Sequence, residues 1–200
     1  MKDWTGNYNS IWKIIGASSH TEEERQQDDY YATDPVAIDK LLTVEKPYPL
    51  IWECACGEGH LSKRLQDFGY IVYSTDLVDR GYSTGGGIDF LKATSLPKGF
   101  TNCDILTNPP YKYAKEFVLK ALELVKPGKK VFMFLKLTFL EGKARYTELY
   151  SKYPPKTVYV FSERVSCIKN GEGEFNHGAV CYAWYVWEKG YTGTTEIKWI

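Results

Sequence analysis

Short apolar runs alternate along this sequence with segments of helical periodicity, and that order restricts the fold more than any other feature. Six runs are rich in strand-forming residues, at Leu50–Cys54, Tyr70–Thr75, Cys103–Thr107, Lys130–Leu135, Val158–Phe161 and Val180–Trp187. Helical patterns at Gly59–Phe68 and Tyr113–Val125 separate the earlier runs. Strands that alternate with helices are typical of an α/β fold, a mostly parallel sheet with helices on both faces. The last two runs have no helix between them and predict a C-terminal antiparallel hairpin.

The length of 200 residues suits one domain with a sizeable core and is too short for a second full domain. We interpret residues 1–29 as an N-terminal arm that is partly flexible, because the stretch from Gly16 to Asp29 is polar and has no clean period. We expect a single domain over residues 30–200.

Charge and hydropathy exclude two classes of protein. Lys and Arg number 25 and Asp and Glu also 25, so the net charge is zero, which argues against a strongly basic nucleic-acid packaging protein. Any contact with nucleic acid must therefore come from a local basic patch. No stretch approaches the roughly 18 consecutive apolar residues of a membrane span, and no signal-like start is present. We expect a soluble, cytoplasmic protein without membrane contacts.

The cysteines give no sign of a metal site. Their number is odd and none are spaced as C-x2-C, the pattern of a zinc site. They are Cys54, Cys56, Cys103, Cys167 and Cys181. We interpret them as small buried thiols in a reducing compartment, and we expect no bound metal.

A glycine-containing turn, Glu53-Cys-Ala-Cys-Gly57-Glu-Gly59, follows the first strong strand and opens a helix. Its glycines permit a tight turn and a close approach of ligand to backbone at the carboxyl edge of the sheet. Glu53 ends the strand and can take the ammonium of an amino-acid moiety. The turn is not a G-x-G-x-x-G dinucleotide fingerprint, and taken alone it is explained equally well as a structural turn.

Two more acidic residues follow the glycine turn. Asp76 ends the next strand, where it can accept hydrogen bonds from both hydroxyls of a ribose. Asp89 offers a carboxylate to an adenine amino group, beside the aromatic face of Phe90. Each alone is compatible with a surface acid or a core phenylalanine, but three acids in this order after successive strands are harder to explain in that way.

The segment Thr107-Asn108-Pro109-Pro110-Tyr111 stands directly after the strand Cys103–Thr107. A proline turn capped by Asn explains the dipeptide Asn-Pro on its own. The whole Asn-Pro-Pro-Tyr sequence is a much more specific pattern than Asn-Pro alone, because it follows an apolar strand and lies downstream of an acid-x-x-x-Gly-x-Gly turn.

These residue types suit the activation of an aromatic amine, whose lone pair is delocalised into its ring. The Asn108 amide oxygen and the Pro109 carbonyl oxygen can accept hydrogen bonds from its two N–H bonds and favour a tetrahedral, nucleophilic nitrogen. Pro109 and Pro110 fix φ and help hold these acceptors in place, while Tyr111 supplies a face on which a planar base can stack. With a methyl donor held in line, this chemistry requires orientation and no catalytic His, nucleophilic Cys or metal.

Together these residues resemble the amino-methyltransferases, and specifically the S-adenosylmethionine-dependent DNA N6-adenine methyltransferases. In that family a Tyr-x-Thr-Pro-like element precedes the glycine turn and Asn-Pro-Pro-Tyr; here it is Tyr30-Tyr-Ala-Thr33-Asp34-Pro35, with Asp34 inserted. The resemblance runs from about Asp29 to Trp187 and is closest to short bacteriophage-type members. Those members carry stretches similar to Phe139-Leu-Glu-Gly-Lys143, Ser162-Glu-Arg164 and Tyr182–Trp187. The resemblance implies a Rossmann-like seven-stranded sheet of strand order 3-2-1-4-5-7-6.

The resemblance also implies S-adenosylmethionine as the cofactor and assigns the residues that contact it. These are Tyr31, Thr33, Pro35, Glu53, Cys54, Ala55, Gly57, Gly59, Asp76, Leu77, Asp89, Phe90 and Asn108. Thr33 and Pro35 are expected at its methionine end. The catalytic loop is Asn108, Pro109, Pro110 and Tyr111, and its acceptor is the N6 of an adenine flipped out of DNA. Expected contacts to the substrate are Tyr111, Lys112, Lys136, Lys143, Arg145 and Phe175.

Two departures from the family and one ambiguity concern the substrate. Larger members carry a target-recognition domain for which this chain has no room, so sequence specificity stays open. In the segment Cys167–His177, Phe175 is the only candidate for a second aromatic side chain against the base, and His177 is interpreted as a loop residue. The basic residues after the acceptor loop, Lys115 included, suit phosphate contacts. For each lysine alone, a solvated helix face is the simpler interpretation.

Three alternatives remain open. Release-factor methyltransferases use a similar Asn-Pro-Pro-Tyr loop on a protein glutamine, although their usual helical N-terminal domain is absent here. RNA is a second possible acceptor. The third alternative is a non-catalytic protein that binds S-adenosylmethionine or nucleic acid. The sequence leaves the target sequence, strandedness and oligomeric state open.

Overall fold

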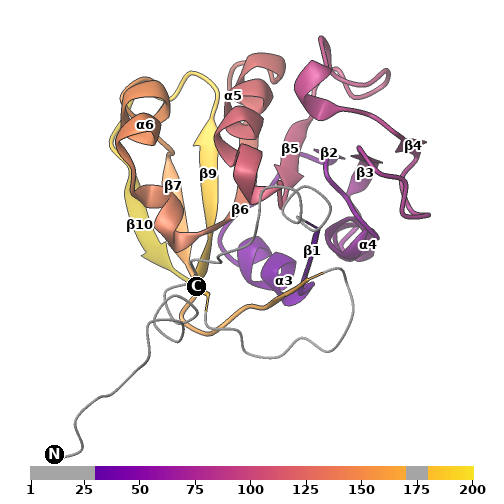
Figure 1. The fold of residues 1–200 in the computed structure, drawn as a ribbon, viewed down its shortest axis with the longest axis horizontal. Coiled ribbons are helices and arrows are strands. Elements are labelled where there is room, and N and C mark those ends of the chain that lie inside the picture. The colour runs from indigo at the N-terminus through magenta and orange to yellow at the C-terminus, as the bar shows by residue number, and fades with distance from the viewer. Residues whose placement is uncertain (1–29, 170–179) are drawn as a thin grey trace, which may run out of the picture.

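The computed structural model describes residues 30–169 and 180–200, which form an α/β structure (Figure 1). The proposed N-terminal arm, 1–29, and the candidates Phe175 and His177 lie outside the described residues.

The strands are β1 (Tyr31–Thr33), β2 (Leu50–Glu53), β3 (Ile71–Asp76), β4 (Gly85–Gly86), β5 (Asp104–Thr107), β6 (Lys130–Lys136), β7 (Thr157–Val160), β8 (Cys167–Lys169), β9 (Tyr182–Glu188) and β10 (Glu196–Trp199). The α-helices are α3 (Val36–Leu42), α4 (His60–Asp67), α5 (Ala114–Leu124) and α6 (Lys143–Arg145). The 3-10 helices are η1 (Phe90–Lys92), η2 (Tyr111–Tyr113) and η3 (Leu137–Leu140), and η4 (Tyr146–Tyr150) is a π-helix.

The main sheet has the order β10-β7-β9-β6-β5-β2-β3-β4. Strand β9 is antiparallel to both of its neighbours, β6 and β7, and the other pairings in this sheet are parallel. The predicted order 3-2-1-4-5-7-6 is found along β4-β3-β2-β5-β6-β9-β7, and the antiparallel β7–β9 pair confirms the predicted hairpin.

The expected count of seven strands is wrong, because the sheet has an eighth, β10, at its edge. All four residues of β10 are exposed. Backbone pairing to β7 holds the strand, including bonds from Glu196 N to Lys156 O at 3.0 Å and from Ile200 N to Val160 O at 3.0 Å. A strand without a buried face lacks the apolar run on which the sequence prediction depends.

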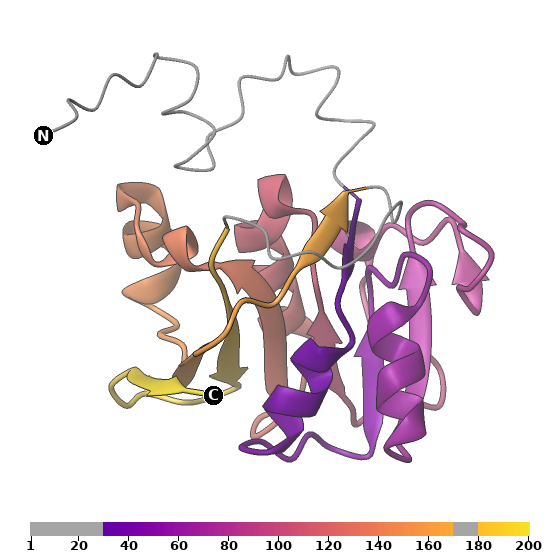
Figure 2. The ribbon, with the colours of Figure 1, turned by 90° about the horizontal axis from the view of Figure 1, so that it is seen from below.

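Helices cover both faces of the sheet and form two apolar layers, as expected for this pattern. On one face Ile38 and Leu41 of α3, with Leu65 of α4, pack against Phe132 and Trp184. Figure 2 shows these two helices in front of the sheet. On the other face α5 covers the sheet with Phe117, Val118, Ala121 and Leu122, which pack among Trp52, Met133 and Tyr185.

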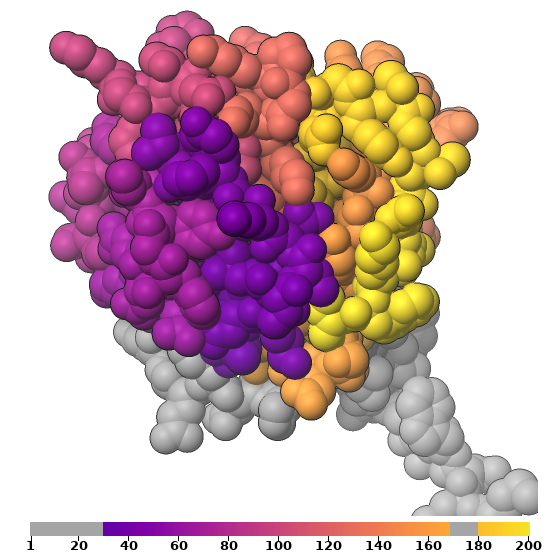
Figure 3. Space-filling model, turned by 180° about the vertical axis from the view of Figure 1, so that it is seen from behind, coloured from indigo at the N-terminus to yellow at the C-terminus, as the bar shows by residue number. Residues whose placement is uncertain are grey.

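Segments from both ends of the described chain lie side by side on the face of α3. Figure 3 shows this contact between the indigo and yellow parts of the surface. The indole nitrogen of Trp184 in β9 donates to the carbonyl of Ala37 in α3 at 2.9 Å. Within residues 30–169 and 180–200, no helix combines the length and apolar character that crossing a bilayer requires.

Strands β1 and β8 form a separate two-stranded ribbon, which pairs antiparallel with Thr33 opposite Cys167 (Figure 2). Both strands have three residues, and their pattern did not predict them as strands. The ribbon matters for the site, because it brings Thr33 against Asn108, which follows β5.

Candidate active site

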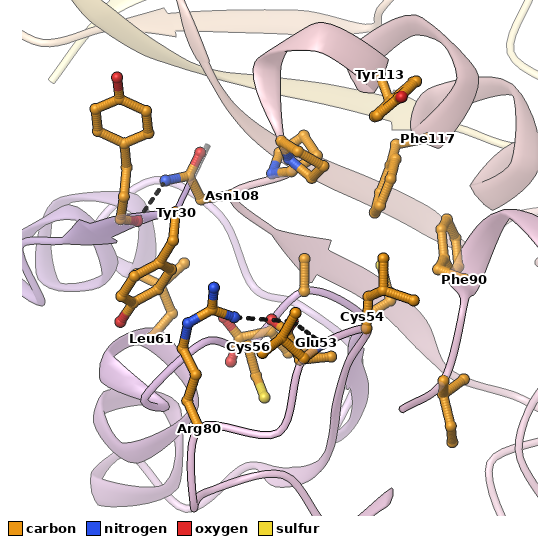
Figure 4. A pocket seen from close by; sticks show the side chains of 18 of the residues that line it. Tyr30, Glu53, Cys54, Cys56, Leu61, Arg80, Phe90, Asn108, Tyr113 and Phe117 are labelled. Carbon is orange, nitrogen blue, oxygen red and sulfur yellow. Dashed lines mark hydrogen bonds and ion pairs between the residues drawn. The ribbon is translucent and has the colours of Figure 1, made fainter. Parts of the chain in front are cut away.

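A cavity of about 820 Å³ lies where β2, β3 and β5 end, within the size range of small-molecule sites. Parallel strands end at a common edge of a sheet, so the residues that follow them meet there. Most of the predicted site residues line this cavity: Tyr31, Thr33, Glu53, Cys54, Ala55, Asp76, Leu77, Asp89, Phe90, Asn108, Pro109, Pro110 and Lys112. Figure 4 shows the arrangement of several of them.

Gly57 and Gly59 shape the turn beside the cavity without lining it. Their φ angles of +53° and +79° lie in the left-handed region, which L side chains rarely adopt. A Cβ atom on Gly57 would overlap the ring of Tyr30, and one on Gly59 would overlap the ring of Tyr82. Both the backbone and the close aromatic rings therefore require glycine.

The carboxyl group of Glu53 is buried at the base of the turn. It accepts a hydrogen bond from Ser62, whose hydroxyl also lies 2.6 Å from that of Ser74. Burial raises the pKa of Glu53 to about 8, and the nearby negative charge of Asp76 adds to the effect, while the Ser62 hydrogen bond opposes it. Without a cationic partner the group is therefore mostly neutral near pH 7, and a positively charged ligand would favour its ionised form.

Asp76 is already engaged by the protein. Its Oδ2 accepts from the backbone N–H of Gly57 at 2.8 Å, and its Oδ1 accepts from Val78 N at 2.9 Å and from Arg80 at 3.3 Å. The guanidinium of Arg80 also lies 4.3 Å from the ring centre of Tyr30 (Figure 4). Asp76 thus joins the glycine turn to the loop after β3, and Arg80 occupies part of its acceptor capacity.

Asp89 and Phe90 lie in the cavity wall at the start of η1. Asp89 Oδ1 accepts from Leu91 N at 3.1 Å and caps this turn, while Oδ2 pairs with Lys92 at 3.1 Å. The Phe90 ring contacts the rings of Trp52 and Phe117, with centroids 5.1 and 5.0 Å away. Both residues therefore have a structural role as well as a position in the wall.

Asn108 presents a buried oxygen that has no hydrogen-bond partner within the described residues. Its amide nitrogen donates to Thr33 Oγ1 at 2.8 Å and to the carbonyl oxygen of Tyr31 at 3.2 Å. Because a carbonyl can only accept, the nitrogen must face Tyr31 and the oxygen Oδ1 must face away from it. An unsatisfied buried acceptor is costly, which makes Oδ1 a strong candidate for contact with an N–H donor.

Tyr111 does not line the cavity, in contrast to the other three residues of the loop. Its ring packs between Tyr31 and Tyr182, with centroids 5.5 and 6.1 Å away, and Lys136 Nζ lies 4.8 Å from its centre. Burial raises the pKa of the Tyr111 hydroxyl well above its usual range, and the hydroxyl lies 3.7 Å from Cys167 Sγ. The predicted stacking of a base on Tyr111 thus stays a prediction, and this packing leaves little of the ring for it.

The basic residues predicted for the substrate do not gather at the cavity. Lys112 alone of them lines it, and Lys143 is exposed at the start of α6. The expected phosphate contact of Arg145 stays a prediction; its guanidinium donates to the carbonyl of Phe139 at 2.9 Å and to those of Thr138 and Glu141. Lys115 pairs with Glu148 at 2.6 Å. Pro35 precedes α3 and lies outside the cavity wall.

Several wall residues were missed by sequence reasoning. They are Tyr30, Ala32, Cys56, His60, Leu61, Val78, Arg80, Ile88, Leu91, Tyr113 and Phe117. The i, i+4 spacing of Tyr113 and Phe117 after the Asn-Pro-Pro-Tyr loop is a signal that could have identified them. No comparable signal marks Arg80. Within the described parts of the chain, no group of three or more His, Cys, Asp or Glu side chains is placed to hold a metal ion.

No protein-family model matches this sequence, and no curated protein matches it. Solved structures do match the fold. A proposed class I S-adenosylmethionine-dependent methyltransferase from Listeria monocytogenes matches with a TM-score of 0.55 and 14% identity, over 96% of this chain and 70% of its own. A proposed hemolysin from Lactococcus lactis gives a TM-score of 0.55 and 13% identity, over 81% of this chain and 88% of its own.

A third structure is the modification subunit of a proposed type I restriction enzyme from Vibrio vulnificus. It matches with a TM-score of 0.52 and 13% identity, over 94% of this chain and 48% of that chain. The chain shares their α/β fold. At these identities the likeness establishes the fold alone, and the chemistry must be argued from the site.

Proposed function

We propose that this protein transfers a methyl group from S-adenosylmethionine to an exocyclic amino group, with the N6 of a flipped adenine in DNA as the acceptor. The observation that carries the proposal is the Asn108 oxygen, which has no partner among the described residues and belongs to the wall of a cavity that also carries Glu53, Asp76 and Asp89. The Listeria and Vibrio proteins of the same fold, described as an S-adenosylmethionine-dependent methyltransferase and a restriction-enzyme modification subunit, support it.

The residues of the cavity fit S-adenosylmethionine. Glu53 would hold the ammonium group, because its buried carboxyl lines the cavity and a cation beside it would favour the ionised form. Asp76 would accept from the ribose hydroxyls, and Asp89 with Phe90 would hold the adenine. When bound, the cofactor supplies an electrophilic methyl group on a sulfonium.

Arg80 must adjust if Asp76 is to bind a ribose. Its guanidinium hydrogen-bonds Asp76 Oδ1, and the side chains of Arg80 and Asp76 are only 24% and 12% exposed. Both lie in the cavity wall together with Tyr30, which stacks on the guanidinium. The Arg80 side chain is long and flexible, so it can turn away and release the carboxylate.

The acceptor amine would be held by two oxygens of the same loop. Asn108 Oδ1 accepts from one N–H bond and the Pro109 carbonyl from the other, which draws the nitrogen lone pair out of conjugation and directs it toward the cavity. Pro109 and Pro110 restrict φ, so these acceptors are ordered before the substrate arrives. The reaction then requires alignment, and the methylated ammonium can release its proton to water.

Transfer of a labelled methyl group to defined single- and double-stranded oligonucleotides tests the proposal. We expect N6-methyladenine in the digested product, and no label when Asn108→Ala replaces the wild type, although cofactor binding is retained. Asn102→Ala is the matched control, because Asn102 lies outside the cavity wall and its amide donates only to Tyr48 within the described residues.

Three outcomes would count against the proposal at different levels. Label in a protein glutamine or in RNA would retain the methyl transfer and replace the acceptor. Failure of the wild type to bind S-adenosylmethionine would refute the cofactor assignment. Equal labelling by wild type and Asn108→Ala would refute the proposed role of Asn108.

A further inference from the structure

We propose that Thr33 is a positioning residue, which fixes the side-chain amide of Asn108 with its oxygen toward the acceptor amine. The inference rests on the proposed function, and it differs from the expectation that Thr33 contacts the methionine end of the cofactor. Thr33 is 3% exposed and its hydroxyl accepts from Asn108 Nδ2 at 2.8 Å, the shortest contact that the amide makes.

The hydrogen bonds of the Asn108 amide are divided unequally between its two ends. The nitrogen has two hydrogens and two oxygen acceptors, the Thr33 hydroxyl and the Tyr31 carbonyl, while the oxygen has no partner within the described residues. An asparagine amide can rotate by a half turn at little steric cost, because oxygen and NH2 have similar sizes. Rotation would point N–H groups at the N–H groups of the substrate and would remove the acceptor.

Thr33 also affects the strength of the acceptor. Donation by the amide N–H groups polarises the amide and increases the negative charge on its oxygen, since hydrogen bonds in a chain reinforce one another. The Thr33 hydroxyl oxygen also accepts from the Cys167 thiol, whose Sγ lies 3.9 Å away. A hydroxyl oxygen that serves as an acceptor for both Asn108 and Cys167 therefore favours the observed amide orientation.

The β1–β8 ribbon gives Thr33 its fixed position. Thr33 pairs with Cys167 in the antiparallel register, and the backbone N–H of Asp34 donates to Ser166 O at 3.1 Å just beyond that pair. This backbone pairing holds the hydroxyl against a residue 75 positions later in the chain. The ribbon thus has a defined role, which is to present two acceptors to the Asn108 amide.

The variants Thr33→Val and Thr33→Ser test the inference in the full-length protein. Valine keeps the shape and removes the hydroxyl, whereas serine keeps the hydroxyl. We expect Thr33→Val to lower kcat about tenfold at saturating cofactor and acceptor, with the cofactor Kd within about twofold of wild type. Thr33→Ser should restore kcat to within about threefold of wild type.

The matched control is Thr43→Val, the same change at an exposed helix end, where the hydroxyl donates to Lys40 O at 2.7 Å. It should leave kcat unchanged. A raised cofactor Kd in Thr33→Val with unchanged kcat would make Thr33 a cofactor contact and overturn the inference. Equal loss of kcat in Thr33→Val and Thr33→Ser would overturn it as well.

A second readout does not depend on activity. In protein labelled with 15N at asparagine, the Asn108 side-chain NH2 signals can be assigned by their loss in Asn108→Ala. We expect these signals to shift and to exchange faster in Thr33→Val and to stay near wild type in Thr33→Ser. Unchanged signals in Thr33→Val would refute the positioning role. If the wild type transfers no methyl group, the proposed function fails and these spectra alone decide the inference.

Discussion

The guanidinium of Arg80 hydrogen-bonds Asp76 Oδ1 at 3.3 Å, on the same cavity wall where Asp76 is proposed to accept from the cofactor ribose. The carboxylate thus has two competing partners, one from the protein and one from the ligand. Since a ligand can bind only after the competing contact is lost or shared, the ion pair reduces the affinity for the cofactor.

Replacing Arg80 should therefore strengthen cofactor binding. We predict that Arg80→Gln lowers the Kd for S-adenosylmethionine roughly two- to fivefold, the scale of a partly exposed ion pair. Isothermal titration calorimetry measures the effect. Arg64→Gln is the control, because Arg64 pairs with Asp39 and Asp67 outside the cavity. Weaker binding by Arg80→Gln would show instead that the guanidinium holds the ligand.

The glycine turn allows a second prediction, in which two glycines of positive φ are compared. Gly57 has φ of +53° and a Cβ there would overlap Tyr30, whereas Gly69 has φ of +86° and open space around it. Both alanine variants carry backbone strain, of about 1–2 kcal/mol, but only Gly57→Ala also collides with a ring. We predict that Gly57→Ala loses more unfolding free energy than Gly69→Ala in urea denaturation, by at least about 1 kcal/mol.

The Tyr30→Ala variant tests whether the Tyr30 ring causes the additional loss in Gly57→Ala. It removes the ring, so the additional loss caused by Gly57→Ala should shrink in the double variant. If Gly57→Ala and Gly69→Ala lose the same free energy in the wild-type background, the ring does not constrain the turn.

The sequence predicted the features that depend on burial. Buried strands such as β5 and β6 are continuous apolar runs, and the side chains that follow parallel strands meet at one edge. For this reason Glu53, Asp76 and Asn108 could be expected in one place, and the structure brings them together. The predicted roles of these residues remain to be tested.

The sequence could not predict the features that depend on distant pairings. The ribbon strand β1 is held by β8, more than a hundred residues away, and the edge strand β10 has no buried face. Arg80 was missed because its contacts to Asp76 and Tyr30 depend on the path of one loop. The carbonyl partners of Arg145 likewise depend on the path of its own local turn.

The buried carboxyl of Glu53 makes the stability of the ligand-free protein depend on pH. Its pKa is about 8 in the folded protein against an ordinary value of 4.5, so between these values the folded state keeps a proton that the unfolded state has lost. This contribution is fully present below about pH 4.5 and is lost as pH rises through 8, at up to roughly 1.4 kcal/mol per pH unit.

We predict that Glu53→Gln, which cannot ionise, removes this pH dependence. Urea denaturation from pH 5 to pH 9 should show wild-type stability falling relative to the variant as pH rises. Ser62→Ala serves as a comparison, since it removes a hydrogen bond to Glu53 and keeps the titrating group. Parallel curves for wild type and Glu53→Gln would contradict the raised pKa.

The raised pKa of the Glu53 carboxyl also leads us to predict that cofactor binding releases a proton. Near pH 7 burial keeps the Glu53 carboxyl mostly neutral, and an ammonium held against it favours the ionised form, so the proton must leave when the ligand binds. Calorimetric titration of S-adenosylmethionine in two buffers of different ionisation enthalpy measures this proton directly.

We expect the observed enthalpy to differ between the buffers for the wild type by an amount that corresponds to a substantial fraction of one proton. For Glu53→Gln the difference should vanish and the affinity should fall, because a neutral amide neither releases a proton nor pairs with a charge. An enthalpy independent of the buffer in the wild type would mean that Glu53 does not receive the ammonium.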